Sequence, residues 1–245
     1  MAATEALFRE DSYLREAEAK IVGINERGGI LLDRTIFYAT SGGQPGDIGR
    51  IIRANGETIE IAGTITGESK DEIVHLPAPG QQVPEIGEAV TLAIDWDRRL
   101  KLMRMHTACH LLTVICPYPI TGAAVSEDDA RVDFDLPDSD FTKEDVTARL
   151  RELIAADHAV STRWITDDEL AANPAMVKSK NVRPPMGSGR IRLVLIGADG
   201  AIDSQPCGGT HVRSLAEIGE IHIGKIEKKG RENRRFRLRF GPIPA

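Results

Sequence analysis

Aromatic and cysteine residues are both scarce in this chain of 245 residues. Phe, Trp and Tyr make up 4% of it, so its hydrophobic cores must be built mainly from Leu, Ile, Val and Ala. Only three residues are cysteine, and their positions indicate no disulfide pair. No apolar leader follows Met1, and no apolar run approaches the roughly 20 residues of a membrane span. We therefore expect a reduced, cytoplasmic protein with no membrane partner.

The chain is acidic overall, but its C-terminal part is basic. The formal net charge is −6, yet residues 213–240 contain nine Lys or Arg and four Asp or Glu, a net of +5 that leaves −11 for the rest. An acidic body with a basic face fits a polyanionic partner such as RNA. The alternative is a solvated strand and turn with no partner. The candidate phosphate contacts are Lys225, Lys228, Lys229, Arg231, Arg234, Arg235, Arg237 and Arg239.

Residues 1–97 have the pattern of short β-strands. Residues 58–66 alternate, with Ile59, Ile61 and Ile65 on one side, and turns rich in glycine and proline recur throughout the stretch. Several short strands at this spacing are typical of a small barrel. We therefore predict an N-terminal β-barrel domain.

Residues 98–245 mix helical and strand patterns and form the second predicted domain. Apolar residues at helical spacing predict a helix over 98–116, which Pro117 ends. Thr142 and Thr166 are predicted N-caps of two further helices. The strands expected here cover 131–136, 191–195 and 235–240, and a basic loop covers 178–192.

Two pairs of metal-ligating side chains share one spacing. His106 and His110 are four apart on the predicted helix, so their rings project from one face. Cys207 and His211 are also four apart, but the two glycines between them favour a tight turn. Three imidazoles and one thiolate suit tetrahedral Zn²⁺. Each pair alone is more often packing or chance, but both in a chain with six histidines indicate a metal site, either structural or catalytic.

Five motifs in sequence order carry a resemblance to a known family. They are residues 41–47 (SGGQPGD), 106–112 (HTACHLL), 131–134 (RVDF), 207–212 (CGGTHV) and 217–219 (EIG). The series resembles the editing region of alanyl-tRNA synthetases, and most of all their free-standing relatives, the AlaX trans-editing proteins. This resemblance implies an α+β fold: an N-terminal small β-barrel, then a two-layer α/β editing domain of the threonyl- and alanyl-tRNA synthetase type. The domains would cover 1–97 and 98–245.

The resemblance also implies an activity. It implies hydrolysis of the ester in mischarged tRNA(Ala), chiefly seryl-tRNA(Ala) with glycyl-tRNA(Ala) as a further substrate, while alanyl-tRNA(Ala) is spared. The implied partner is tRNA, with no DNA or membrane, and the oligomeric state is open between a monomer and a weak dimer. The implied zinc ligands are His106, His110, Cys207 and His211. The catalytic candidates are His106, His110, Thr107 and Gln44, and the pocket candidates are Gly42, Gly43, Gln44, Thr107, Gly208 and Gly209.

Selectivity is the demanding part of this chemistry. An aminoacyl ester is already activated, so zinc could activate a water, polarise the ester carbonyl or only shape the pocket. Serine exceeds alanine by one hydroxyl, and a site that hydrogen-bonds this hydroxyl rejects alanine. We predict that contact for Thr107, with Gln44 second; the alternative for Thr107 is a hydroxyl bonded back to the helix. Cys109 is expected to point into the core as a thiol of ordinary pKa.

Other classes of function fit parts of the pattern. A non-catalytic RNA-binding module with a structural zinc would use the same four ligands. A metalloesterase for small substrates would leave the basic C-terminal segment without a purpose. Editing of another mischarged tRNA is a variant of the predicted activity, but residues 41–47 and 207–211 resemble the alanyl type.

Overall fold

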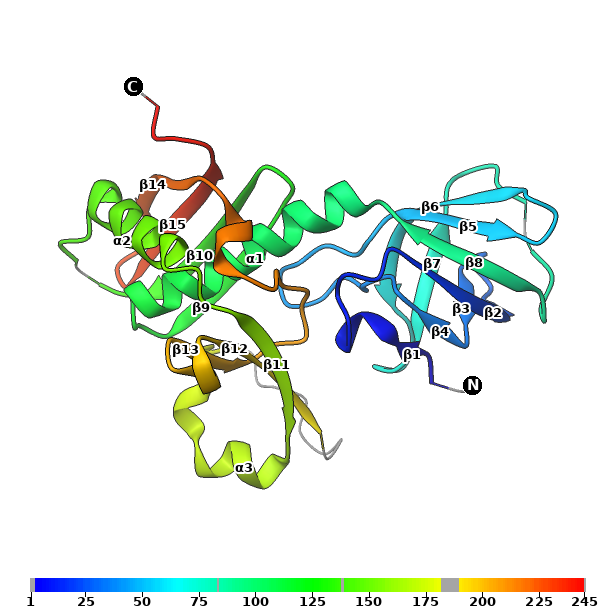
Figure 1. Cartoon of the computed structure of the whole chain (residues 1–245), viewed down its shortest axis with the longest axis horizontal. Coiled ribbons are helices and arrows are strands. Elements are labelled where there is room, and N and C mark those ends of the chain that lie inside the picture. Colours follow the sequence, from blue (N-terminus) through cyan, green and yellow to red (C-terminus); the bar gives the residue numbers. More distant parts are fainter. Residues whose placement is uncertain (1–2, 83, 138, 182–189, 245) are drawn as a thin grey trace. The chain divides into compact units, whose positions relative to one another are not determined.

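The computed structural model describes residues 3–82, 84–137, 139–181 and 190–244. The chain divides into two compact units, Met1–Leu100 and Lys101–Ala245, each of which has its own hydrophobic cluster (Figure 1). The predicted α+β class, a small barrel followed by an α/β unit, is confirmed. The predicted division after residue 97 falls in the first turn of helix α1 (Trp96–Ile115).

The first unit is a closed barrel of six antiparallel strands (Figure 1). In order round the barrel these are β2 (Glu16–Ile24), β3 (Ile30–Leu32), β7 (Ile73–Pro77), β6 (Thr58–Thr66), β5 (Gly49–Arg53) and β8 (Ala89–Ile94). Aliphatic side chains such as Ile21, Ile51 and Leu92 fill the interior and are fully buried. The remaining elements of the unit are a parallel pair, β1 (Glu5–Ala6) with β4 (Arg34–Thr35), and the 3-10 turn η1 (Leu7–Arg9).

Strand β6 departs from the simple alternation expected of it. Ile59 and Ile61 are buried, but Ile65 is 40% exposed and Thr64 is buried in its place. The pairing of β6 with β7 shifts register between Ile61 and Gly63. Such a bulge adds one residue to a strand and reverses which side chains face the core. The expectation that Ile65 faces inward with the other two isoleucines is therefore wrong.

Residues 41–47 begin with a tight turn. Ser41 and Gln44 exchange backbone hydrogen bonds of 2.9 and 3.1 Å. Gly42 and Gly43, between them, have φ angles of +57° and +84°. A type I′ turn requires positive φ at both central positions, which glycine adopts without a steric cost. The glycine pair of this motif is therefore explained by backbone geometry.

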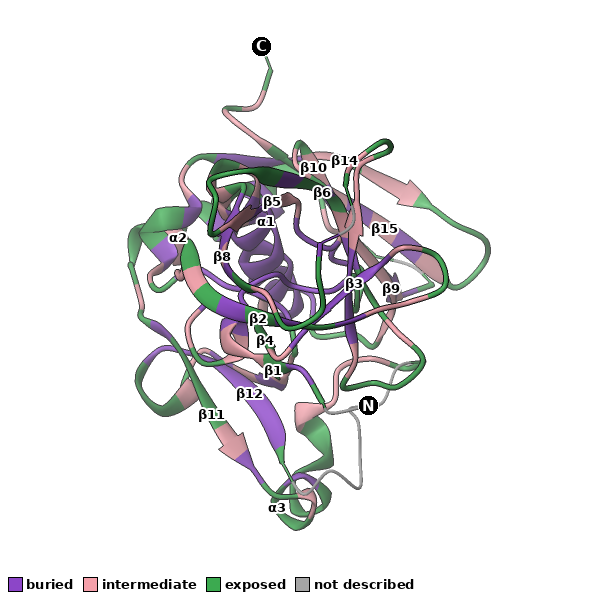
Figure 2. Ribbon diagram, turned by 90° about the vertical axis from the view of Figure 1, so that its right-hand side faces the viewer, coloured by how far each residue is buried: buried purple, intermediate pink, exposed green. Residues whose placement is uncertain are grey.

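Helix α1 corresponds to the helix predicted over 98–116. Between residues 102 and 116, every residue except Arg104 and Val114 is buried, and Figure 2 shows this part of the helix in purple. Side chains on such a helix project into protein rather than into solvent. The helix is therefore a rigid, enclosed support for the residues it carries.

The second unit contains two antiparallel sheets (Figure 1). The four-stranded sheet has the order β14 (Ile221–Lys228), β15 (Asn233–Phe240), β10 (Asp129–Asp135) and β9 (Ile120–Val125). The three-stranded sheet has the order β11 (Val160–Ile165), β12 (Ile191–Ile196) and β13 (Asp203–Pro206). These strands confirm those expected at 191–195 and 235–240, and β10 matches the one expected at 131–136 except that it ends at Asp135. Strand β12 is buried along its whole length (Figure 2).

Helix α2 (Lys143–Ala155) packs against β14, and its N-cap is Thr142, whose side chain accepts the N–H of Asp145. Helix α3 (Asp167–Ala172) has a complete capping box between Thr166 and Glu169. Both predicted caps are confirmed. The short 3-10 segments are η2 (Pro174–Met176), η3 (Ala198–Gly200) and η4 (Leu215–Ile218). Within the described ranges, no helix combines the length and apolar character needed to cross a membrane.

Candidate metal centre

Four side chains from two distant segments converge in the second unit. His106 and His110 lie on successive turns of α1, while Cys207 and His211 lie in the loop that follows β13. One ligand atom from each residue lies within 4.8 Å of the ligand atoms of the others. The Sγ of Cys207 is 3.5 Å from Nε2 of His106 and 3.3 Å from Nε2 of His211. The structure thus brings together all four ligands that the sequence selects.

This donor set fits a tetrahedral zinc ion. Ligand atoms bonded to zinc at tetrahedral angles lie about 3.3 to 3.8 Å from one another. The two sulfur–nitrogen distances agree with that range. The three histidines are buried and Cys207 is partly exposed. Imidazole and thiolate ligands of this kind suit Zn²⁺, so the residues fit the metal that the sequence predicts.

Thr107 determines which nitrogen of His211 is available. Its hydroxyl donates to the carbonyl oxygen of Met103 at 2.9 Å and so has no second proton for Nδ1 of His211, 3.1 Å away. Nδ1 of His211 must therefore donate to Thr107, which leaves the lone pair on Nε2, facing Cys207. The backbone N–H of Val212 donates to the same hydroxyl at 3.3 Å. The back-bonded hydroxyl considered for Thr107 is confirmed, and protein atoms take its one donor and two acceptor positions.

The surroundings of Cys207 favour a thiolate. Burial alone raises the pKa of this thiol, but its interactions with neighbouring histidines, His106 first among them, outweigh burial and bring the pKa well below its usual value. The N–H of Gly209 also donates to Sγ, at 3.4 Å. Arg192 holds the loop in place, because its guanidinium donates to the carbonyls of Cys207 and Gly209, each at 2.9 Å.

His110 contacts an acid that sequence reasoning missed. Its Nδ1 lies 3.3 Å from Oδ2 of Asp203, the first residue of β13. Burial raises the pKa of Asp203, but the hydrogen bond to His110 and the charge of Lys178 outweigh burial and lower it to about 2. The one sequence signal for Asp203 was its place on the predicted segment that leads into Cys207.

Cys109 is a buried residue of α1, as expected of a core thiol. Burial, together with the charge of Cys207, raises its pKa to about 12. The expectation of an ordinary pKa is therefore wrong. A thiol with so high a pKa is not a nucleophile at neutral pH.

The glycines and the glutamine of the candidate pocket belong to two segments. Gly208 is exposed and Gly209 is buried in the loop that contains Cys207 and His211. Gly42 and Gly43 form the turn of the first unit, and Gln44 is fully buried there. Their shared part in a substrate pocket stays a prediction.

The eight predicted tRNA contacts differ in what they touch. Arg234 is 9% exposed and donates to backbone carbonyls. Arg235 pairs with Asp133 at 2.7 and 2.8 Å, and Arg237 pairs with Glu227 at 2.7 Å. These arginines are thus held by their own sheet. The exposed members are Lys225, Lys228, Lys229, Arg231 and Arg239.

The second basic candidate, residues 178–192, is described only at its ends. Residues 182–189 lie outside the described part of the chain. At one end Lys178 contacts the carboxylate of Asp203, and at the other Arg192 is 7% exposed and faces the metal-ligand loop. The side chains of Lys178 and Arg192 therefore contact protein atoms of the candidate metal centre.

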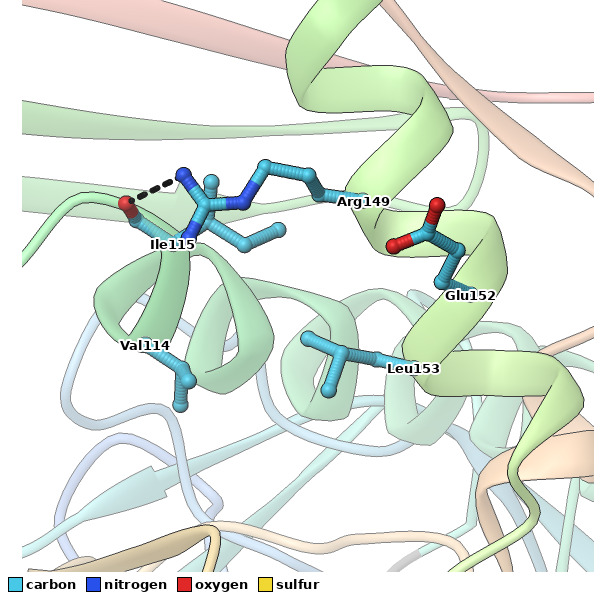
Figure 3. Close-up of a pocket in the computed structure, with 5 residues that line it drawn as sticks. All are labelled: Val114, Ile115, Arg149, Glu152 and Leu153. Carbon is cyan, nitrogen blue, oxygen red and sulfur yellow. Dashed lines mark hydrogen bonds between the residues drawn. The ribbon is translucent and has the colours of Figure 1, made fainter.

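A pocket of about 290 Å³ lies between the last turn of α1 and α2 (Figure 3). Its lining residues are Val114, Ile115, Arg149, Glu152 and Leu153. Arg149 donates to the carbonyl of Ile115 at 3.4 Å, near the C-terminal end of α1. None of the lining residues is one of the four candidate ligands, so this pocket is not the candidate site.

Comparison with known protein families gives a match in each unit. Residues 3–98 match the family described as tRNA synthetases class II (A). Residues 191–237 match the family described as threonyl and alanyl tRNA synthetase second additional domain, and this match includes Cys207 and His211. These two matches therefore relate parts of the chain to domains of these synthetases.

Individual relatives define the family. The chain is 34% identical to the alanyl-tRNA editing protein AlaX-M of Methanosarcina mazei, over 95% of each chain. It is also 34% identical to AlaX-M of Saccharolobus solfataricus, over 95% of this chain and 97% of the relative. It is 34% identical to an alanine–tRNA ligase of Pyrobaculum aerophilum, over 92% of this chain and 25% of that protein. The chain belongs to the AlaX family of alanyl-tRNA editing proteins, as its motifs predict.

Proposed function

We propose that this chain is a trans-editing hydrolase that deacylates mischarged tRNA(Ala) and spares alanyl-tRNA(Ala). Its main substrate is seryl-tRNA(Ala), and glycyl-tRNA(Ala) is a second one. The observation that carries the proposal is the convergence of His106, His110, Cys207 and His211 within 4.8 Å in a member of the AlaX family. Relatives named alanyl-tRNA editing proteins match the chain over nearly their full lengths. Hydrolysis of an activated ester needs no ATP.

The four ligands provide the centre of the proposed site. When bound there, Zn²⁺ would lower the pKa of a water to about 7 or polarise the ester carbonyl. The chain's own part is to hold the ligand atoms in place. His106 and His110 do so from an enclosed helix, and Thr107 directs Nε2 of His211 toward Cys207. Ligands fixed in this way need little rearrangement when a metal or substrate binds.

Selection of serine requires a polar group for the seryl hydroxyl. A buried group that bonds this hydroxyl is left unpaired by alanine, which disfavours the correct product as a substrate. Of the two candidates for this contact, Thr107 has a hydroxyl already bonded to three protein atoms, and Gln44 is completely buried with partners of its own. Glycine lacks the hydroxyl as well, so its hydrolysis depends on its smaller size and should be slower.

The tRNA is held through its phosphates by the basic C-terminal strands. Five of the eight candidate side chains are exposed, and they lie on β14, β15 and the turn between them. Phosphate contacts position an RNA without reading its sequence, and they make affinity depend steeply on salt. The arginines paired with Asp133 and Glu227 support this surface rather than supply its strongest contacts.

The test is deacylation of seryl-tRNA(Ala) beside alanyl-tRNA(Ala) with native, metal-stripped and zinc-restored protein. We expect serine release that is lost on stripping, restored by zinc and much faster than alanine release, while circular dichroism shows a retained fold. If the zinc-loaded protein releases neither amino acid but still binds tRNA, it is instead a zinc-containing RNA-binding module. Faster release from another mischarged tRNA would redirect the substrate assignment.

A further inference from the structure

We propose that Asp203 is a positioning residue that fixes the tautomer and orientation of the metal ligand His110, and that Lys178 neutralises Asp203 for this role. The inference rests on the proposed zinc-dependent function, which it deepens. It assigns a role to two residues outside the four-ligand cluster. Both come from segments that the motif pattern does not connect with His110.

The contact with His110 has one chemical interpretation. Oδ2 of Asp203 is 3.3 Å from Nδ1 of His110, and the carboxylate side chain is completely buried. An ionised carboxylate is an acceptor only, so Nδ1 must carry the hydrogen. In the neutral ring, the form that binds a metal, the lone pair then resides on Nε2, the nitrogen that does not face Asp203. A metal-ligating histidine commonly has its second nitrogen tied to a carboxylate in this way, which also raises its basicity.

The carboxylate of Asp203 is itself held from three sides. Lys178 Nζ contacts Oδ1, and Gln205 Nε2 donates to Oδ2 at 2.7 Å. Both donors also contact the hydroxyl of Thr113, at 3.0 and 3.3 Å. That hydroxyl donates to the carbonyl of His110 at 2.8 Å. The network therefore returns to the same histidine through its backbone, and the position of the acid is fixed relative to the ring.

The backbone around Lys178 is also fixed. The N–H of Ile120 donates to the carbonyl of Lys178, and the carbonyl of Ile120 accepts the N–H of Lys180, both at 2.8 Å. This pairing joins the segment to β9 and directs the Lys178 side chain at Asp203. A buried carboxylate without such a partner would be costly.

A role in stability alone does not account for the arrangement. A buried ion pair is weak evidence of stabilisation, because desolvation of both charges opposes their attraction. Here the second carboxylate oxygen faces a ring that belongs to the ligand cluster. Thr107 fixes His211 in the same way through Nδ1. Two of the three histidine ligands thus have Nδ1 tied to a protein acceptor, which is the arrangement expected of a metal site.

The first test uses the wild-type protein loaded with zinc and labelled with ¹⁵N in its imidazoles. NMR should show His110 bonded to the metal through Nε2, with a hydrogen on Nδ1. Coordination of His110 through Nδ1 would overturn the inference. If the wild-type protein binds no zinc, the proposed zinc-dependent function is wrong. That outcome differs from coordination through Nδ1, which contradicts only the role of Asp203.

The second test measures zinc affinity by competition with a chromophoric chelator. We expect Asp203→Asn to weaken zinc binding about 10- to 100-fold, with a changed Co²⁺ absorption spectrum in the folded protein. The matched control is Asp135→Asn, which removes a carboxylate paired with Lys180 at 2.6 Å and outside the ligand cluster. This control should stay within about twofold of wild type. A folded Asp203→Asn protein with wild-type affinity and spectrum would overturn the inference; if that variant does not fold, the wild-type NMR result decides.

Discussion

Arg99 and Asp47 form an ion pair that is enclosed within the first unit. Arg99 is 0% exposed and Asp47 is 1% exposed. The Nε of Arg99 donates to both carboxylate oxygens at 3.0 Å, and its two terminal nitrogens reach the carbonyls of Ser12 and Ile36 at 2.9 and 2.7 Å. Asp47 is the last residue of the motif at 41–47, so the acid of this motif has a structural partner on α1.

The first prediction concerns this pair. Replacement of Arg99 by Met should lower the free energy of unfolding by about 3 to 5 kcal/mol, because it leaves the Asp47 carboxylate buried without its cation. The measurement is denaturant unfolding followed by circular dichroism. The control is Arg34→Met, which removes an exposed pair with Glu5 and should cost less than about 1 kcal/mol. Equal effects of the two substitutions would contradict the structural role of the buried pair.

The second prediction concerns Gly46, in the same motif. A Cβ at this position would lie 1.9 Å from the backbone oxygen of Thr64, so the chain must move to accept one. Gly46→Ala should therefore destabilise the barrel by about 3 kcal/mol or more. Gly63→Ala is the control, because its Cβ would meet only a leucine methyl at 3.9 Å. Thermal unfolding of the two variants compares them, and a Gly46→Ala protein as stable as the control would refute the close approach.

The third prediction concerns the pH dependence of stability. His75 is fully buried, with Nδ1 near the carbonyl of Ile30 and Nε2 near the hydroxyl of Thr35, and burial lowers its pKa from 6.5 to about 4. The unfolded chain takes up a proton near pH 6.5 that the folded barrel resists until about pH 4. The contribution of His75 is therefore complete above pH 6.5 and is lost as the pH falls to about 4, by about 3 kcal/mol.

Unfolding free energies measured from pH 8 to pH 4 test this window. His75→Gln should flatten the fall in stability between pH 6.5 and pH 4, whatever its effect at pH 8. An unchanged slope in His75→Gln would show that other groups control the acid sensitivity.

The fourth prediction concerns Thr107. Thr107→Val removes the acceptor of His211 Nδ1 and should weaken zinc affinity about tenfold or more, with a parallel loss of seryl-tRNA(Ala) hydrolysis. Thr107→Ser retains the hydroxyl and should recover most of both. We expect the ratio of serine to alanine release to stay constant. If Thr107→Val keeps its zinc affinity but the ratio of serine to alanine release falls, Thr107 would instead be the residue that binds the seryl hydroxyl.

The fifth prediction concerns the basic surface. Replacement of Lys228, Arg231 and Arg239 by Gln should weaken tRNA binding and reduce the slope of log affinity against log salt by about 1 for each phosphate that the protein no longer neutralises. Arg235→Gln should act mainly on stability, because that arginine is paired with Asp133. Filter binding at several salt concentrations measures the slope. An unchanged slope in the triple variant would mean that these side chains face solvent and do not contact the tRNA.

Local signals in the sequence were sufficient for most of the secondary structure and for the family. The capping box at Thr166 and Glu169 and the strand at 58–66 depend on neighbours a few residues away, so their patterns are visible in the sequence. The paired spacings of histidine and cysteine are likewise local. They identify the four candidate ligands because few other residues in the chain offer imidazole or thiolate.

Only the tertiary structure decided what surrounds those ligands. Asp203 meets His110 across 93 positions of sequence, and Arg99 meets Asp47 across 52. The bulge in β6 depends on how that strand pairs with β7, so alternation alone placed Ile65 on the wrong side. The direction of the Thr107 hydroxyl depends on the atoms packed around it. Spacing in the sequence thus determines which side chains can bind a metal, whereas hydrogen bonds between distant segments determine which atom of each is available.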